Sequence, residues 1–221
     1  MRGKSSVTLT DCCCVFDAPL DARQPSLYSR AMEILPCCRL SFALAAPERL
    51  DPRSALEKVL ERCDLAEVEE TILQSIPYSG FPAAVEALGW LREQHPDGAS
   101  RLAAQEHEDS FFAQVYGEGE AKVRASLQDR HPDLERWIID FAYGTVMESS
   151  WFSSATIEAL AVASLIGQGR LRPLHSHLRG ALRTGHTQAT LSSLLEALQD
   201  VADAEVLRAA TKMLEREGGG A

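Results

Sequence analysis

The sequence predicts an all-α protein built from two copies of one helical-hairpin unit. Apolar residues recur at helical spacing along most of the chain, and the two-residue alternation typical of strands is nearly absent. The helical rhythm of the first third also returns in the last third, about 120 residues later. With 221 residues, 45% of them hydrophobic, the chain is long enough to bury a sizeable core.

Changes in composition divide the chain into four parts. Residues 1–26 mix Ser, Thr, Asp, Pro and Gly without periodicity, which predicts a flexible N-terminal arm. The first repeat is predicted over 27–95 and the second over 154–217, joined by a helical connector over 96–153. We expect the two repeats to stack as a duplicated bundle.

Helices of the first repeat are bounded by loop and proline signals. Pro52 suits the first turn of a helix, and an apolar stripe follows it. Breaks are predicted at 63–65 and at 77–80, and Pro82 suits the first turn of a further helix over 81–91.

The connector and the second repeat continue the helical pattern. Amphipathic stretches lie at 121–127 and 134–146, and the second is predicted to supply a core face. That face comprises Trp137, Ile138, Phe141 and Ala142. Helices of the second repeat are predicted at 157–166, 174–182, 191–198 and 206–214.

The duplication is visible when the outer thirds are aligned. Segments 40–45 and 72–74 lie over 160–165 and 194–196, and the offset drifts by only two residues between them. Sequence identity between the copies is low, and hairpins of similar length align easily. The alignment therefore supports the repeat without assigning it a function.

Charge and hydropathy exclude several partners. The net charge is −10, and no cluster of Lys and Arg interleaved with aromatic residues offsets it, so nucleic acid is not expected as a partner. No segment approaches the roughly 18 consecutive apolar residues that a membrane-spanning helix needs. The first 20 residues lack the apolar core of a signal peptide, so we predict a cytoplasmic protein.

The six cysteines do not form the spaced framework of a disulfide scaffold. They occur as a run, Cys12–Cys14, a neighbouring pair, Cys37 and Cys38, and the single Cys63. Reduced thiols are therefore expected. For the Cys12–Cys14 run, a thiol or metal site and a simple tail segment both stay open.

One pair of residues could carry acid/base chemistry. Helical spacing places Glu158 on the apolar side of its helix, and His177 lies at the flank of the apolar stripe of the next helix. If the two helices pack antiparallel, the carboxylate can fix the imidazole tautomer and the histidine can exchange a proton. The structural alternative is a carboxylate at a helix N-terminus and a core histidine.

Other polar residues share the helix of His177. Arg179 could grip a carboxylate with two hydrogen bonds, and Gly180 permits close approach of a neighbouring helix. His175 adds an imidazole, but residues two apart on a helix point away from each other, so one ion cannot easily bind both histidines. We therefore predict no metal site.

Two segments resemble a known family. Residues 174–185, LHSHLRGALRTG, are similar to the H-x-R-x-A-L-x-x-G helix of the carboxymuconolactone decarboxylase family and its alkylhydroperoxidase AhpD-like relatives. Residues 69–84 resemble the family's E-x-x-L-Q-x-x-x-Y-x-G-x-P-A-A segment. The resemblance covers most of residues 39–215 and implies a duplicated AhpD-like helical bundle.

The departures from this family are informative. AhpD-type peroxidases carry E-x11-C-x-x-C-x3-H, and Glu158 and His177 keep that spacing while Arg170 and Pro173 stand at the cysteine positions. This argues against peroxidase chemistry at the pair. The family's usual arginine before the glutamate is replaced by Ile157.

Each repeat has lost what the other retains. The first copy lacks the glutamate and the histidine, and the second lacks the tyrosine segment. We therefore hypothesise one composite site per chain, in which Tyr78 and the helix beginning at Pro82 face Glu158, His177 and Arg179.

The resemblance implies a function as well. It points to decarboxylation-type, cofactor-free acid/base chemistry on a small carboxylated lactone or related acid. His177 would deliver the proton and Glu158 would orient it, while Arg179, Tyr78 and His175 would bind the substrate. The alternatives are a non-catalytic helical oligomer of the same family and an AhpD-like thiol oxidoreductase or peroxidase. Family members self-associate, which implies a homotrimer or a hexamer.

Overall fold

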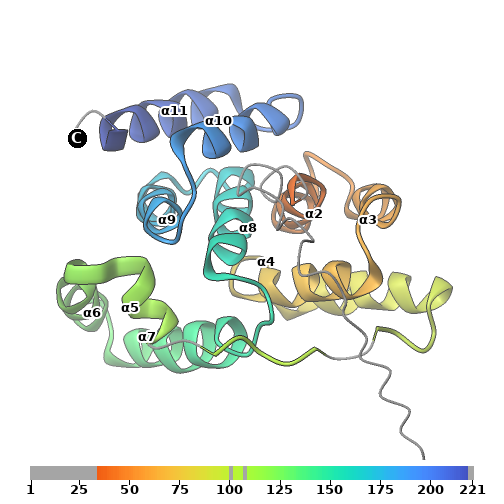
Figure 1. Cartoon of the computed structure of the whole chain (residues 1–221), viewed down its shortest axis with the longest axis horizontal. Helices are drawn as coiled ribbons and strands as arrows, with labels where there is room; N and C mark the ends of the chain where they lie inside the picture. Colours follow the sequence, from red (N-terminus) through yellow and green to blue (C-terminus); the bar gives the residue numbers. More distant parts are fainter. Residues whose placement is uncertain (1–33, 100–101, 107–108, 219–221) are drawn as a thin grey trace, which may run out of the picture.

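A computed structural model describes residues 34–99, 102–106 and 109–218. Throughout this part the chain is helical and contains no β-strand, so the predicted all-α helical bundle is confirmed (Figure 1). The predicted N-terminal arm, with Cys12–Cys14, lies outside the described residues.

The segment predicted as the first repeat forms α2 (Leu35–Ala45), α3 (Pro52–Leu60) and α4 (Leu65–Gln94). Side-chain caps fix the starts of two of these helices. Asp51 accepts a hydrogen bond from the backbone N–H of Ser54 at α3, and Asp64 forms a reciprocal capping box with Glu67 at α4. The predicted break at 63–65 therefore coincides with the start of α4.

The second predicted break is a kink inside α4. Gly80 has φ 80° and ψ 167°, between Pro77 and Pro82, and the helix resumes beyond it. Glycine adopts this positive φ without a steric penalty, and each proline lacks the N–H that a continuous helix would use. The predicted break at 77–80 is therefore present, and it is concentrated at Gly80, where two helical segments meet at a kink.

The connector holds more structure than its pattern indicated. Its elements are α5 (Phe111–Tyr116), the short 3₁₀ helix η1 (Gly117–Gly119), α6 (Glu120–Gln128), α7 (Pro132–Trp137) and the π-helix η2 (Ile138–Met147). The sequence analysis did not recognise α5. Six residues are too few to show helical periodicity.

The core face predicted for the connector is wrong in part. Trp137 is 60% exposed and Phe141 38% exposed, whereas Tyr143 and Met147 are buried. The reason is that η2 forms the wider π-helical turn, with backbone bonds five residues apart, so α-helical spacing does not identify its inner face.

The segment predicted as the second repeat forms α8 (Ser154–Gly167), α9 (Leu171–Arg183), α10 (Gln188–Ala197) and α11 (Ala204–Gly218). α10 begins with a capping box between Thr187 and Thr190, at the position that corresponds to the start of α4. The order of elements from α8 to α10 therefore follows that from α2 to α4.

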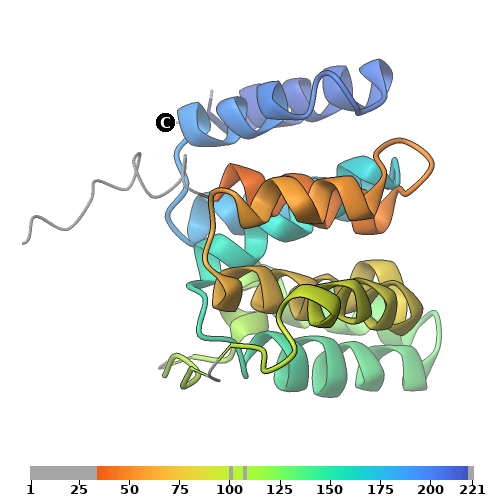
Figure 2. The same cartoon turned by 90° about the vertical axis from the view of Figure 1, so that its right-hand side faces the viewer.

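The helices are stacked in layers. Figure 2 shows α10 and α11 on one outside of the bundle and the green helices of the connector on the other, with the remaining helices between them. α2 packs along α8 at the centre, where the hydroxyls of Ser41 and Ser164 are hydrogen bonded at 2.8 Å. α8 is buried along almost its whole length, so any polar side chain on it is removed from water.

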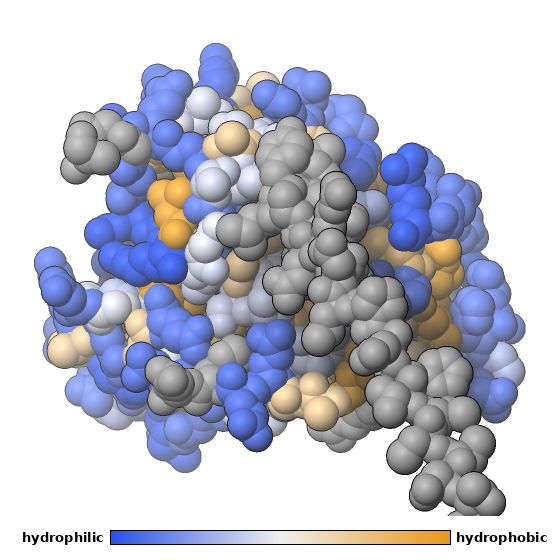
Figure 3. Space-filling model, viewed as in Figure 1, coloured by the Kyte–Doolittle hydropathy of each residue, from blue (hydrophilic) through white to orange (hydrophobic). Residues whose placement is uncertain are grey.

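One face of the molecule is mostly polar where it can be seen. Figure 3 shows a face dominated by hydrophilic residues, with hydrophobic ones visible mainly in hollows between them. Among the described residues, no helix is both long enough and apolar enough to cross a membrane.

Candidate active site

The site centres on a carboxylate and an imidazole from adjacent helices. Glu158 on α8 is 0% exposed and His177 on α9 is 5% exposed. His177 Nδ1 lies 3.2 Å from Oε1 and 3.1 Å from Oε2 of Glu158. The predicted juxtaposition of the two residues is therefore present in the structure.

A glycine makes this approach of α8 and α9 possible. A Cβ atom at Gly180 would overlap Glu158 Oε2 and would lie 2.8 Å from Val115 Cγ1. Since real Cβ atoms essentially never approach other atoms so closely, only glycine fits without displacing the carboxylate. The close helix approach expected at Gly180 serves Glu158 directly.

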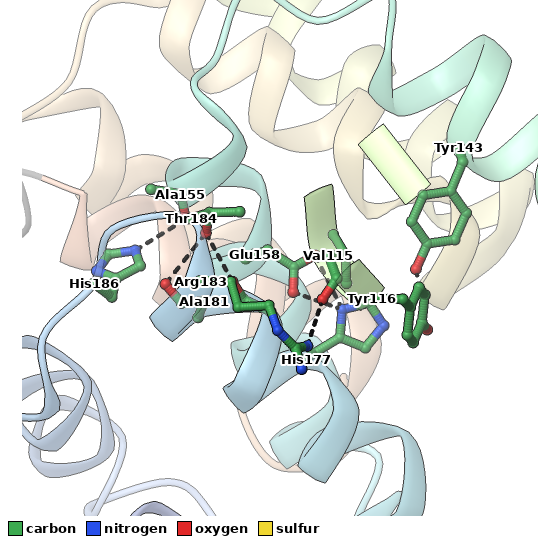
Figure 4. Close-up of polar contacts among 11 residues, drawn as sticks. Val115, Tyr116, Tyr143, Ala155, Glu158, His177, Ala181, Arg183, Thr184 and His186 are labelled. Atoms are coloured by element: carbon green, nitrogen blue, oxygen red, sulfur yellow. Dashed lines mark hydrogen bonds and ion pairs between the residues drawn. The ribbon is translucent and has the colours of Figure 1, made fainter. Parts of the chain in front are cut away.

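The contact with Glu158 fixes the imidazole tautomer. A carboxylate can only accept, so the Nδ1–H of His177 donates to it and Nε2 remains for proton exchange. Figure 4 shows the imidazole lying between Glu158 and Tyr116. The geometry is that of an oriented general acid or base.

Tyrosines surround the other sides of the pair. The Tyr78 ring meets the His177 ring edge-on, with 5.8 Å between centroids. The Tyr143 hydroxyl donates to the Tyr116 hydroxyl at 3.3 Å, and both rings pack on Phe112. Tyr78 from α4 and Tyr116 from α5 thus lie beside the imidazole, and Tyr143 from η2 lies beyond Tyr116 (Figure 4).

Burial keeps these phenols protonated. Desolvation raises the pKa of Tyr78 and of Tyr143 well above 10.0, and the nearby charge of Glu158 acts in the same direction. The pKa of Tyr116 is raised by the same burial, partly opposed by its hydrogen bond from Tyr143. At neutral pH the phenols can only serve as uncharged hydrogen-bonding groups.

The kink of α4 positions Tyr78. Gln168, just past the end of α8, donates from Nε2 to the Tyr78 carbonyl at 2.6 Å. This carbonyl lies two residues before Gly80, where the helical hydrogen-bond ladder is interrupted. Tyr78, from the segment predicted as the first repeat, therefore lies beside the pair, which is one part of the composite-site hypothesis.

Two predicted substrate-binding residues lie elsewhere. Arg179 Nε is 3.2 Å from Glu217 Oε2, and His175 Nε2 is 3.1 Å from Glu217 Oε1, so both side chains pair with α11. Positions two residues before and after His177 fall on another side of α9. The placement of Arg179 and His175 beside Glu158 is therefore corrected.

Sequence reasoning missed Tyr116 and the inward direction of Tyr143. Tyr116 belongs to the short α5, and Tyr143 to the π-helix, so neither stands in a recognisable periodic pattern. The arginine of α9 that reaches α5 is Arg183, whose Nη1 donates to the Val115 carbonyl at 2.8 Å (Figure 4). The available signal was the run of aromatic residues Phe111, Phe112 and Tyr116.

The described thiols lie apart from the pair. Cys37 Sγ is 3.6 Å from Cys63 Sγ, and this hydrogen bond raises the pKa of Cys63. Burial raises the pKa of Cys38 as well. Cys38 and Cys63 therefore stay protonated at neutral pH and are weak nucleophiles. Within the described ranges, no group of three or more His, Cys, Asp or Glu residues is arranged to hold a metal ion.

Fold and site together define a helical bundle with a buried carboxylate–imidazole pair. No family model matches the chain. The chain is similar to Peroxisomal protein 2 of Schizosaccharomyces pombe, with 27% identity over 136 residues, covering 57% of this chain and 64% of that protein. The chain thus spans less than two thirds of this relative, and the match assigns no family.

Proposed function

We propose that the chain is a carboxymuconolactone decarboxylase-like enzyme that acts by cofactor-free acid/base chemistry on a small carboxylated lactone or related acid. The observation that carries the proposal is the contact of His177 Nδ1 with both oxygens of the fully buried Glu158. A carboxylate held so close fixes the tautomer of the imidazole and leaves Nε2 to accept or donate a proton.

The reaction needs one proton delivered to carbon. When the bond between the ring carbon and the carboxylate breaks, CO₂ leaves and its electron pair remains as an enolate. His177 gives its Nε2 proton to that carbon, and solvent returns a proton to the imidazole. Protonated Tyr78 or Tyr116 is suited to donate a hydrogen bond to the enolate oxygen, since burial raises the pKa of both phenols.

Recognition of the substrate carboxylate is reassigned within this proposal. Arg179 is tied to Glu217, so it no longer serves as the clamp. Arg183 is the alternative, because its guanidinium reaches α5 next to Tyr116. An Arg183→Gln variant should therefore raise KM more than Arg179→Gln does.

A second candidate is a non-catalytic helical oligomer of the same family. It is favoured by the burial of the pair, since Glu158 is 0% exposed and His177 is 5% exposed. On this alternative, the pair only stabilises the packing of α8 against α9.

An assay with purified full-length chain separates the two candidates. CO₂ release from 4-carboxymuconolactone is measured for wild type, His177→Gln and Arg179→Gln. We expect turnover that falls at least about 100-fold in His177→Gln, as general acid–base catalysis typically contributes that much, and persists in Arg179→Gln. If the wild-type protein had no activity on carboxylated lactones, the non-catalytic oligomer would be favoured.

Assembly and compartment belong to the same proposal. We propose self-association as a homotrimer or hexamer, for which light scattering is the test, and a monomer at all concentrations would contradict it. The name of the Schizosaccharomyces pombe relative refers to the peroxisome. Imaging of a tagged full chain in cells therefore decides between the predicted cytoplasmic location and a peroxisomal one.

A further inference from the structure

A pocket of about 410 Å³ lies between α4 and η2, away from the Glu158–His177 pair. It is of the size that binds small organic ligands. Its floor is polar, formed by Glu70 and Gln74, and much of its wall is apolar. The apolar residues are Leu73, Ile76, Phe81, Leu102, Phe141, Val146 and Trp151.

The floor holds a carboxylate without a cation. Glu70 is 9% exposed, and its Oε1 accepts hydrogen bonds from Gln74 Nε2 at 2.9 Å and from Ser150 Oγ at 2.5 Å. Both donors are neutral, and no ion pair of the described residues includes Glu70. Its Oε2 has no hydrogen bond among these residues.

The neighbouring carboxylate is already neutralised. Glu69 Oε1 lies 2.6 Å from Arg92 Nη1 and also accepts from the backbone N–H of Ala99 at 2.9 Å. The pocket therefore retains one uncompensated negative charge, on Glu70. Burial of a charge is costly unless it is paired, so a cationic ligand is the natural complement.

Gln74 supplies a second acceptor to the same floor. Its Nε2 donates to Glu70 Oε1 and also to the Val146 carbonyl at 2.9 Å. Flipping the side-chain amide would place its oxygen next to Glu70 Oε1 and the Val146 carbonyl, which are both acceptors. The orientation of the amide is therefore fixed. Gln74 is 2% exposed, and its Oε1 has no hydrogen-bond partner in the described part of the chain. A buried acceptor without a donor is unusual in folded proteins.

The wall presents aromatic surface to solvent. Phe81 is 57% exposed and Phe141 38% exposed, and their ring centroids are 5.6 Å apart. Phe81 follows the Gly80 kink and Phe141 lies on the outer side of η2, so the irregularities of both helices create this wall. Aromatic faces bind both apolar groups and organic cations.

We propose that this pocket binds a small amphipathic amine, with its ammonium group on Glu70 Oε2 and Gln74 Oε1 and its apolar body against Phe81 and Phe141. An ammonium ion supplies donors only, which is what two free acceptors require. A carboxylated ligand would meet Glu70 at the floor and is excluded. The pocket thus selects the opposite charge from the substrate proposed for the Glu158–His177 pair.

Three matched probes test the charge requirement on the unaltered full-length chain. Isothermal titration is carried out with 2-phenylethylammonium, 2-phenylethanol and phenylacetate, which share the aromatic body and differ in the head group. The ammonium compound should bind at least about tenfold more tightly than the alcohol, because a hydrogen bond to a charged group contributes more than one between neutral groups. The carboxylate should not bind measurably.

A variant and its control locate the site. Glu70→Gln removes the charge with little change of shape and should weaken ammonium binding about 10- to 100-fold. Glu86→Gln changes an exposed carboxylate on the same helix and should leave binding unaltered. Circular dichroism verifies that both variants fold. If Glu70→Gln does not fold, the comparison of the three probes on the wild-type chain still tests the proposal.

Several results would overturn the proposal. Equal affinity for the alcohol and the ammonium compound would show an apolar groove that does not select charge. If none of the three probes bound, the pocket would not be a binding site for such ligands. Ammonium binding that survives Glu70→Gln would place the ligand elsewhere. Binding that vanishes as the chain associates at higher concentration would show that a second copy covers this surface.

Discussion

The two buried carboxylates described above, Glu158 and Glu70, differ in the kind of partner that holds them. Glu158 contacts an imidazole, which can accept or donate a proton, and is 0% exposed. Glu70 contacts an amide and a hydroxyl, which stay neutral, and lies on the floor of an open pocket. A titratable partner suits proton transfer, whereas neutral donors leave a fixed charge that suits recognition of a cation.

The surroundings of the two carboxylates differ in the same direction. Glu158 belongs to α8, the most buried helix, and its position depends on the missing side chain of Gly180. Glu70 belongs to α4, whose irregular middle leaves Phe81 outside the core. Removing a partner should therefore lower the free energy of unfolding more at Glu158 than at Glu70.

The largest effect is expected for His177→Leu. It leaves Glu158 buried without its partner, and the free energy of unfolding should fall by about 3–5 kcal/mol in urea denaturation. Ser150→Ala, which removes one neutral donor from Glu70, should cost only about 1–3 kcal/mol. The double variant Glu158→Leu, His177→Leu should recover part of the loss, because it leaves no buried charge. Equal losses in the two single variants would contradict the comparison.

A smaller effect is expected for Gly180→Ala. Its methyl group would displace Glu158 from the imidazole, and overpacking of this kind costs about 1–3 kcal/mol. Gly89→Ala on α4 is the matched control, since a Cβ there meets no atom within 4 Å. It should be neutral or stabilising by up to about 1 kcal/mol, because alanine is the better helix former. Thermal unfolding of both variants checks this, and a loss at Gly89 would remove the distinction.

The smallest effect should appear only in alkali. Folding raises the pKa of Tyr78 and Tyr143 above the value of 10.0 that they recover on unfolding. Their contribution to stability is therefore complete below pH 10 and is lost as the pH rises further. In a spectrophotometric titration, these phenols should ionise only together with the loss of helical circular dichroism. Tyr143→Phe should delay that transition, and tyrosinate formation in the fully folded protein would show that the site is open to water.

Part of this comparison was predictable from local sequence. The spacing of Glu158 and His177 on consecutive amphipathic stretches, with a glycine three residues after the histidine, indicated the pair and the close helix approach that holds it. Tyr78 beside a Pro and Gly break indicated the irregular middle of α4. These features depend on backbone propensity and on helical periodicity, which neighbouring residues determine.

The rest required the folded chain. Arg179 and His175 share a helix with His177, but only the position of Glu217 on α11 shows that they pair there and not at the site. Phe141 was expected inside and Tyr143 carried no expectation, because the choice of a π-helix over an α-helix is made by packing against α4 and α5.

The sequence by itself determined an all-α chain with a helical repeat and a glutamate and histidine in position to meet. Only the tertiary structure decided that Tyr78 and Tyr116 lie beside that pair, and that Glu70 and Gln74 form the floor of a separate pocket. Local propensity extends over a few turns of helix, whereas burial, pKa and charge compensation depend on residues that lie far apart in the chain.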